Sequence, residues 1–211
     1  PDWCRSMTSG SALQTWTGHR NAPIALLDNE PPRVRWQELL DLAERLGSGP
    51  SLYPESIEDR IRMVGISSEI ANEGGLAWQA RLLMLNMTYQ SHGDVVFAKN
   101  PMFKDYGFSE AAVAAAVTRI ESFLELLARQ IKSQQATGSD YLVGRSLSAA
   151  DVYWAFFSNM LEALPPEQNP MPDSLRMGWS ALAKGISGYD PILITHRNRI
   201  FEKHLWLPLE F

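Results

Sequence analysis

The sequence predicts a mostly helical protein that begins with a short α/β portion. Three stretches indicate this fold class. Residues 148–161 are apolar on nearly every helical face, which is typical of a buried central helix. Residues 113–131 place an apolar side chain at every third or fourth position, as in the seam of an antiparallel helix pair. Residues 24–27 form a short apolar run, which indicates a buried strand, and residues 37–46 follow with helical spacing.

The composition limits the class of protein. The chain has 211 residues, of which 45% are hydrophobic and 20% charged, as in an ordinary globular protein of one or two domains. A net charge of −5 argues against a general nucleic-acid surface. No apolar run approaches the ~18 residues that would span a membrane, and no secretory signal is visible. Cys4 is the single cysteine, so we expect no internal disulfide and a cytoplasmic location.

The helix that begins near residue 148 has a well-defined start. Ser148 is the expected N-cap residue, and its hydroxyl can accept the backbone N–H of Asp151. The carboxylate of Asp151 can in turn accept the N–H of Ser148, which completes a capping box. We therefore expect a structural role for Asp151, with a catalytic acid or base as the alternative.

This stretch resembles the sixth helix of the glutathione transferase superfamily. The resemblance covers Leu142 to Asp151, with the Ser-x-x-Asp box that serves folding in that family. A second stretch, Leu52-Tyr53-Pro54, is similar to the linker that leads into the family's all-α domain. The resemblance implies an incomplete thioredoxin-like domain over 1–47, a linker over 48–55 and an all-α domain over 56–211. It also implies a homodimer.

The N-terminal portion resembles the second half of a thioredoxin-like domain, with the strand 24–27, a brief return strand over 34–36 and then a helix. This resemblance implies glutathione as the co-substrate. In the family, the backbone at the position of Ala22 pairs with the cysteinyl part of glutathione, and the proline at the position of Pro23 is cis. The alternative is a trans Pro23 that only begins a strand, since ~5–6% of X–Pro bonds are cis.

Three features of this portion bear on the glutathione site. Trp36 and Gln37 occupy the positions where the family carries a pair that binds the γ-glutamyl group. Gln37 can donate and accept hydrogen bonds, whereas Trp36 cannot replace an acidic residue. The 51 residues before Leu52 are too few for the family's first strand and helix, whose connecting turn holds the thiolate-stabilising residue. Cys4 is the one candidate remnant of that turn, and the alternative is an unplaced terminal cysteine.

The first long helix is predicted over 56–89, and Gly74-Gly75 indicates a kink, a break or a close backbone approach within it. In the family this helix lines the pocket of the second substrate and contributes to the dimer contact. Trp78 and Arg81 are therefore candidate pocket residues for a hydrophobic or electrophilic small molecule. The alternative places Trp78 in the core and makes Arg81 a solvated or interface charge.

Two main functions follow. The first is a glutathione transferase-like enzyme that conjugates or transfers the glutathione thiol, with a cysteine-type thiol transferase acting through Cys4 as a variant. The second is a non-catalytic module that keeps the fold, has a degraded glutathione site and binds a partner or an apolar ligand. We expect no metal, because His92 and Asp94 have no third ligand at a suitable spacing. We also expect no nucleic-acid or membrane partner.

Overall fold

The structure is a computed structural model that describes residues 10–19, 23–186 and 188–209. The chain divides between Pro50 and Ser51 into two compact units, which we call unit 1 and unit 2. No helix within the described ranges is long and apolar enough to cross a membrane. The prediction of a mostly helical protein is confirmed.

Unit 1 contains helix α1 (Gly10–Thr17), helix α2 (Trp36–Leu46) and one isolated antiparallel bridge. The bridge joins Ala25 to Arg33, whose backbone groups exchange hydrogen bonds of 3.0 and 2.9 Å. One bridge is far shorter than the usual strand of about five residues. The predicted strand and return strand are thus reduced to this bridge, and the α/β class is not confirmed for the described residues of unit 1.

The turn inside this bridge is held by charge pairing. Glu30 accepts a hydrogen bond from Arg45 of α2 at 2.6 Å and another from Arg33. The guanidinium group of Arg45, and to a smaller extent that of Arg33, holds the pKa of Glu30 below its usual value. The turn is therefore tied to α2 by ion pairs, where the sequence had indicated a sheet. Helix α1 was not predicted, because the serine, threonine and glycine content of residues 1–13 indicated a loop.

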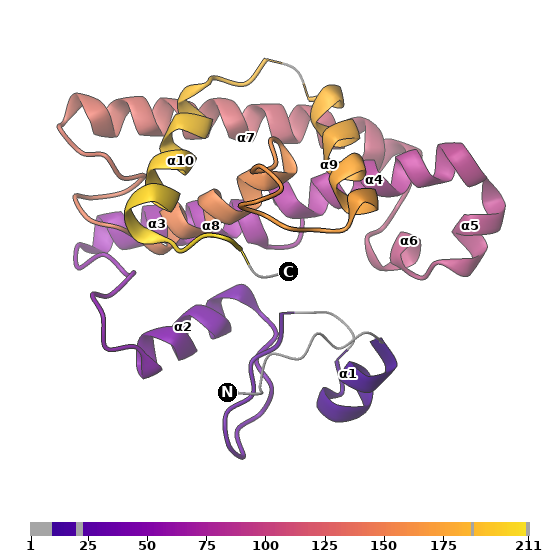
Figure 1. Cartoon of the computed structure of the whole chain (residues 1–211), viewed down its shortest axis with the longest axis horizontal. Helices are drawn as coiled ribbons and strands as arrows, with labels where there is room; N and C mark the ends of the chain where they lie inside the picture. Colours follow the sequence, from indigo (N-terminus) through magenta and orange to yellow (C-terminus); the bar gives the residue numbers. More distant parts are fainter. Residues whose placement is uncertain (1–9, 20–22, 187, 210–211) are drawn as a thin grey trace. The chain divides into compact units, whose positions relative to one another are not determined.

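Unit 2 is a helical bundle (Figure 1). Its helices are α3 (Ile57–Ala71), α4 (Leu76–His92), α5 (Asp94–Lys99), α6 (Met102–Asp105), α7 (Glu110–Ala136), α8 (Ala149–Phe157), the 3-10 helix η1 (Ser158–Met160), α9 (Asp173–Gly185) and α10 (Ile192–His204). Helix α4 packs along α7, α3 packs on α8, and α10 packs on both α7 and α8. The predicted helix pair is confirmed, because the seam of α7 buries Ile120, Leu124, Leu127 and Ile131.

The predicted first long helix is broken into α3 and α4 at the two adjacent glycines. Gly74 has a φ of +79°, in the left-handed region that favours glycine. A Cβ on Gly75 would lie 2.5 Å from the carbonyl oxygen of Glu69, which no real side chain tolerates. Of the three alternatives that the sequence left open, the structure therefore shows a break, together with a close approach of backbone to backbone.

Helix α8 lies at the centre of unit 2, as predicted. Trp154 is completely buried, and its indole N–H donates to the carbonyl of Leu193 in α10 at 3.0 Å. The backbone N–H of Ala149, which has no acceptor inside its own helix, donates to the carbonyl of Leu52 at 3.0 Å. The linker motif and the helix start, which were recognised as separate stretches, are thus joined by a hydrogen bond.

Candidate functional site

The N-terminal end of α8 holds a buried carboxylate whose oxygens are all engaged. Asp151 Oδ2 accepts the backbone N–H of Ser148 at 2.9 Å and the Ser148 hydroxyl at 2.8 Å. Asp151 Oδ1 accepts the N–H of Leu142 at 2.7 Å and lies 3.0 Å from Nε2 of His196. The predicted capping box is formed. In addition to this box, the Ser148 hydroxyl donates its own proton to Asp151 Oδ2.

These contacts give Asp151 a structural role. The carboxylate is completely buried, and its partner His196 is buried as well. A catalytic carboxylate needs access to a substrate, whereas this one is closed in by four contacts from the protein. Sequence reasoning found no partner for His196, because Asp151 lies 45 positions away in the chain.

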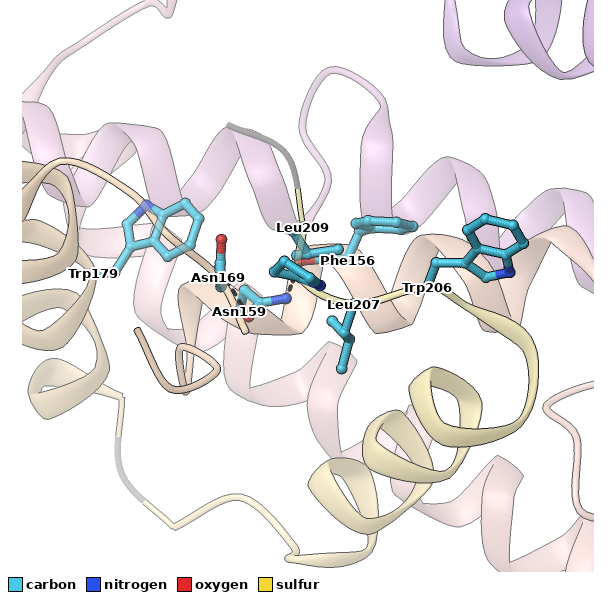
Figure 2. Close-up of a pocket in the computed structure, with 8 residues that line it drawn as sticks. Phe156, Asn159, Asn169, Trp179, Trp206, Leu207 and Leu209 are labelled. Atoms are coloured by element: carbon cyan, nitrogen blue, oxygen red, sulfur yellow. Dashed lines mark hydrogen bonds between the residues drawn. The ribbon is translucent and has the colours of Figure 1, made fainter. Parts of the chain in front are cut away.

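The opposite end of the same helix opens onto a cavity of about 610 Å³, which we call the tail pocket (Figure 2). Its lining consists of aromatic and aliphatic side chains with two asparagines among them: Phe156, Asn159, Asn169, Trp179, Trp206, Leu207, Pro208 and Leu209. The rings come from three separate segments, namely α8, α9 and the C-terminal tail. An apolar cavity with a few fixed polar groups is the usual form of a small-molecule site.

Helix α9 positions Trp179 at one side of the tail pocket. The preceding residue, Gly178, allows α9 to approach α4 closely, because a Cβ there would lie 3.3 Å from the Met84 methyl group. Arg176, on the same helix, donates to the carbonyl of Leu164 at 2.9 Å and to that of Asn169 at 2.6 Å. The guanidinium of Arg176 thus fixes the proline-rich loop that carries Asn169.

The C-terminal tail forms another wall of the tail pocket. Its residue Leu209 donates a backbone hydrogen bond of 2.8 Å to the carbonyl of Gln168. Leu205 and Leu209 pack against a buried cluster formed by Ala155, Leu164, Ile200 and Phe201. Between these two leucines, Trp206 is 92% exposed while its side chain still borders the pocket. The tail is therefore anchored at both ends and leaves a large aromatic ring accessible.

The two asparagines of the tail pocket are buried and linked to each other. Asn159 Nδ2 donates to the carbonyls of Ala155 and Phe156 at 3.3 and 3.1 Å. Asn159 Oδ1 accepts the N–H of Leu164 at 3.0 Å and Nδ2 of Asn169 at 3.4 Å. Asn169 Oδ1 has no partner among the described residues. The sequence offered only a turn-rich segment here, and no local pattern brings these two residues together.

The residues predicted for glutathione are only partly described. Cys4 and Ala22 lie outside the described residues, and so does the peptide bond before Pro23, which is itself exposed. Trp36 and Gln37 are the first two residues of α2, with Trp36 half-buried and Gln37 exposed.

A carboxylate stands one position further along α2, but it is committed to the helix start. Glu38 accepts the backbone N–H groups of Arg35 and Val34 at 3.2 Å each. The hydrogen bond from Arg35, and to a smaller extent that from Val34, holds the pKa of Glu38 below its usual value. The γ-glutamyl contact of Trp36 and Gln37 therefore stays a prediction, and Glu38 does not add a free carboxylate beside them.

The predicted pocket residues Trp78 and Arg81 both lie on α4, but Arg81 is not in the described lining of the cavity that Trp78 borders. Trp78 packs against Tyr106 with ring centroids 4.5 Å apart and borders a cavity of about 380 Å³. The charged residues Glu73, Lys104 and Asp105 also line this cavity, which makes it less suited to a hydrophobic molecule. Arg81 is half-buried and is not part of the lining.

In the part of the chain that the structure describes, no group of three or more His, Cys, Asp or Glu side chains could hold a metal ion. His92 in particular is exposed, and its Nδ1 lies 3.1 Å from the carbonyl of Thr88.

Residues 91–174 match the family "Glutathione S-transferase, C-terminal domain". The matched residues make up less than half of the chain, and they support membership of the glutathione S-transferase superfamily. The resemblance predicted from the sequence is thus confirmed for residues 91–174, and the matched region includes the capping box of α8 and both asparagines of the tail pocket. Comparisons with curated proteins and with solved structures returned no match.

Proposed function

We propose that this superfamily member is a glutathione transferase-like protein that holds a hydrophobic or electrophilic small molecule in the tail pocket. The observation that carries the proposal is the lining of this pocket, where Phe156, Trp179 and Trp206 border an open hollow of about 610 Å³. Aromatic side chains bury a large apolar area against a ligand and offer their ring faces for stacking. Glutathione is the proposed co-substrate and would supply the thiol.

A specific observation favours a second candidate function, a non-catalytic binding module. The described residues of unit 1 provide one β-bridge, and Glu38 at the start of α2 is occupied by backbone N–H groups. Gln37 alone fits the predicted contact with the γ-glutamyl group. In this second function, the tail pocket still binds an apolar molecule, while glutathione is neither bound nor consumed.

Calorimetric titration with glutathione separates the two functions. For the transferase, we expect heat of binding at millimolar glutathione and turnover of an electrophilic aromatic substrate. The Gln37→Ala variant should then bind glutathione more weakly, while Gln135→Ala, an equally exposed change on α7, should not differ from the parent chain. Binding of an apolar molecule without any response to glutathione would overturn the transferase and support the module.

A further comparison addresses Cys4. If a cysteine-type mechanism operates, a Cys4→Ser variant should lose thiol-transfer activity, because a hydroxyl is a much weaker nucleophile than a thiolate. If Cys4→Ser kept full thiol-transfer activity, the cysteine-type mechanism would be excluded.

We also propose a homodimer that forms through α3 and α7, in line with the superfamily resemblance. These helices border an open groove of about 910 Å³, whose lining includes the small residues Gly65, Ala115 and Ser122. Leu126 at this groove is 49% exposed, although it is a large apolar residue. Light scattering should report twice the mass of one chain, and Leu126→Lys should shift the mass toward the monomer. A monomeric parent chain would contradict the proposal.

A further inference from the structure

One polar atom in the wall of the tail pocket lacks a partner. The side chain of Asn169 is 1% exposed, and its Oδ1 is buried with no hydrogen-bond donor near it among the described residues. Buried polar groups in folded proteins are almost always hydrogen-bonded, so each exception needs an explanation. A carbonyl oxygen removed from water costs free energy unless a donor reaches it.

The orientation of this amide is fixed by its neighbours. Nδ2 of Asn169 donates to Asn159 Oδ1 at 3.4 Å, and a flipped amide would place two oxygens against each other. Nδ2 of Asn159 is itself held by the carbonyls of Ala155 and Phe156. Arg176 holds the backbone of Asn169 at 2.6 Å. The oxygen of Asn169 must therefore point away from Asn159, as Figure 2 shows.

The protein covers this oxygen, so a ligand reaches it only when the pocket wall moves aside, and the lining of the pocket then defines which ligand fits. Trp179 lies on one side of the asparagine pair, and Phe156 lies on the other (Figure 2). Among the described residues, lysine, arginine, aspartate and glutamate do not line the tail pocket, so this part of the lining favours an uncharged ligand. An uncharged aromatic molecule fits the rings, and a single O–H or N–H group on it would satisfy the oxygen.

We infer that the tail pocket selects an uncharged aromatic molecule carrying one hydrogen-bond donor, such as a phenol, which donates to Asn169 Oδ1. This inference rests on the proposed function, because it concerns the same pocket. The hydrogen bond gives the site its selectivity, since a site built around a buried polar atom rejects an analogue that leaves this atom unpaired.

A matched pair of ligands tests this inference directly. 2-Naphthol has the O–H donor, whereas 2-methoxynaphthalene has the same ring system and lacks the donor. The ether is the more hydrophobic of the two, so a purely apolar pocket would bind it more tightly. We expect the full chain to bind 2-naphthol about tenfold more tightly by calorimetric titration, the factor of one net hydrogen bond.

Three variants test which residues of the chain cause the preference for 2-naphthol. Asn169→Leu should remove the preference for 2-naphthol, because leucine has a similar size and no acceptor. Asn72→Leu, a matched change at an exposed residue outside the pocket, should keep the preference. Trp179→Leu should weaken the binding of both ligands, because it removes a ring of the lining. Thermal unfolding of each variant shows whether it is folded before its binding is compared.

The possible results are distinct. A preference for 2-naphthol that disappears in Asn169→Leu supports the inference. Equal affinities, or tighter binding of the ether, overturn the role of Asn169 while the tail pocket remains a binding site. No binding of either ligand at millimolar concentration overturns the tail pocket itself, and the inference with it.

Discussion

The two ends of helix α8 contain buried polar side chains in opposite situations. At the N-terminal end, both oxygens of Asp151 are used in full by Ser148, Leu142 and His196. At the C-terminal end, Asn159 is fully used, while Asn169 retains an oxygen with no partner among the described residues. The first end therefore serves folding, and the second leaves one hydrogen bond for a ligand to make.

The difference follows from what each end of a helix requires. A helix start exposes N–H groups that need acceptors, and a carboxylate has only acceptors to offer. A helix end exposes carbonyl groups, which the amide of Asn159 satisfies with its N–H groups. An amide also carries an acceptor, so a pair of amides can leave one oxygen over. The asparagine pair closes the helix end but does not use all of its own hydrogen-bonding groups.

The largest expected effect on stability is at the N-terminal end of α8, where both oxygens of Asp151 are occupied. Asp151→Ala should lower the free energy of unfolding by about 3–5 kcal/mol, as when one partner of a buried polar pair is removed. The change leaves the N–H groups of Leu142 and Ser148, and the ring of His196, without their shared acceptor. Urea unfolding of the full chain, followed by circular dichroism, measures this loss.

A surface carboxylate provides the matched control for this prediction. Asp140 pairs with Arg199, and its side chain is 49% exposed. Exposed pairs contribute about 0–1 kcal/mol, so Asp140→Ala should cost no more than this. If Asp151→Ala lowered the free energy of unfolding as little as Asp140→Ala, the contacts of Asp151 would not stabilise the fold. If Asp151→Ala fails to fold, the milder Asp151→Asn still gives a measurable loss.

The same contrast explains what the sequence could predict. The capping box of Ser148 and Asp151 is visible because its two residues stand three positions apart. The seam of α7 is a local pattern as well, and the structure confirms it. The two glycines marked the position at which one of three open alternatives, a break, is found. Local spacing makes these features visible, because the residues that form each pattern belong to one helix or one turn.

The features that could not be predicted depend on distant partners. His196 lies 45 positions from Asp151, and nothing in either stretch indicates the other. The asparagine pair is brought together by a loop that Arg176 fixes from α9. The apolar run over 24–27 was interpreted as a strand, but a strand also needs a neighbour along its whole length. In the described residues of unit 1, that run has one bridging partner.

A smaller effect on stability, of the opposite sign, is expected at the C-terminal end of α8, where Asn169 Oδ1 lacks a described partner. Asn169→Leu should leave the free energy of unfolding unchanged or raise it by up to about 1 kcal/mol, because replacing an unpaired buried acceptor removes its desolvation cost. Among the described residues, the side-chain hydrogen bond lost is the long one, of 3.4 Å, to Asn159. The same urea experiment measures the change. A loss of more than about 2 kcal/mol would mean that Asn169 Oδ1 is already satisfied in the folded chain.

The smallest effect on stability is expected at Trp206. Its ring is 92% exposed, so Trp206→Ala should change the free energy of unfolding by no more than about 0.5 kcal/mol. The ring nevertheless borders the tail pocket, and its loss should weaken the binding of 2-methoxynaphthalene by about 2- to 10-fold, the usual value of an aromatic pair. Trp16→Ala is the matched control, because Trp16 on α1 is 65% exposed and does not line the pocket. If both variants bound the ether like the parent chain, Trp206 would not contact the ligand, and the pocket would depend on Phe156 and Trp179 alone. A large loss of stability in Trp206→Ala would instead give the tail a folding role like that of Asp151, and the two ends of α8 would no longer differ in kind.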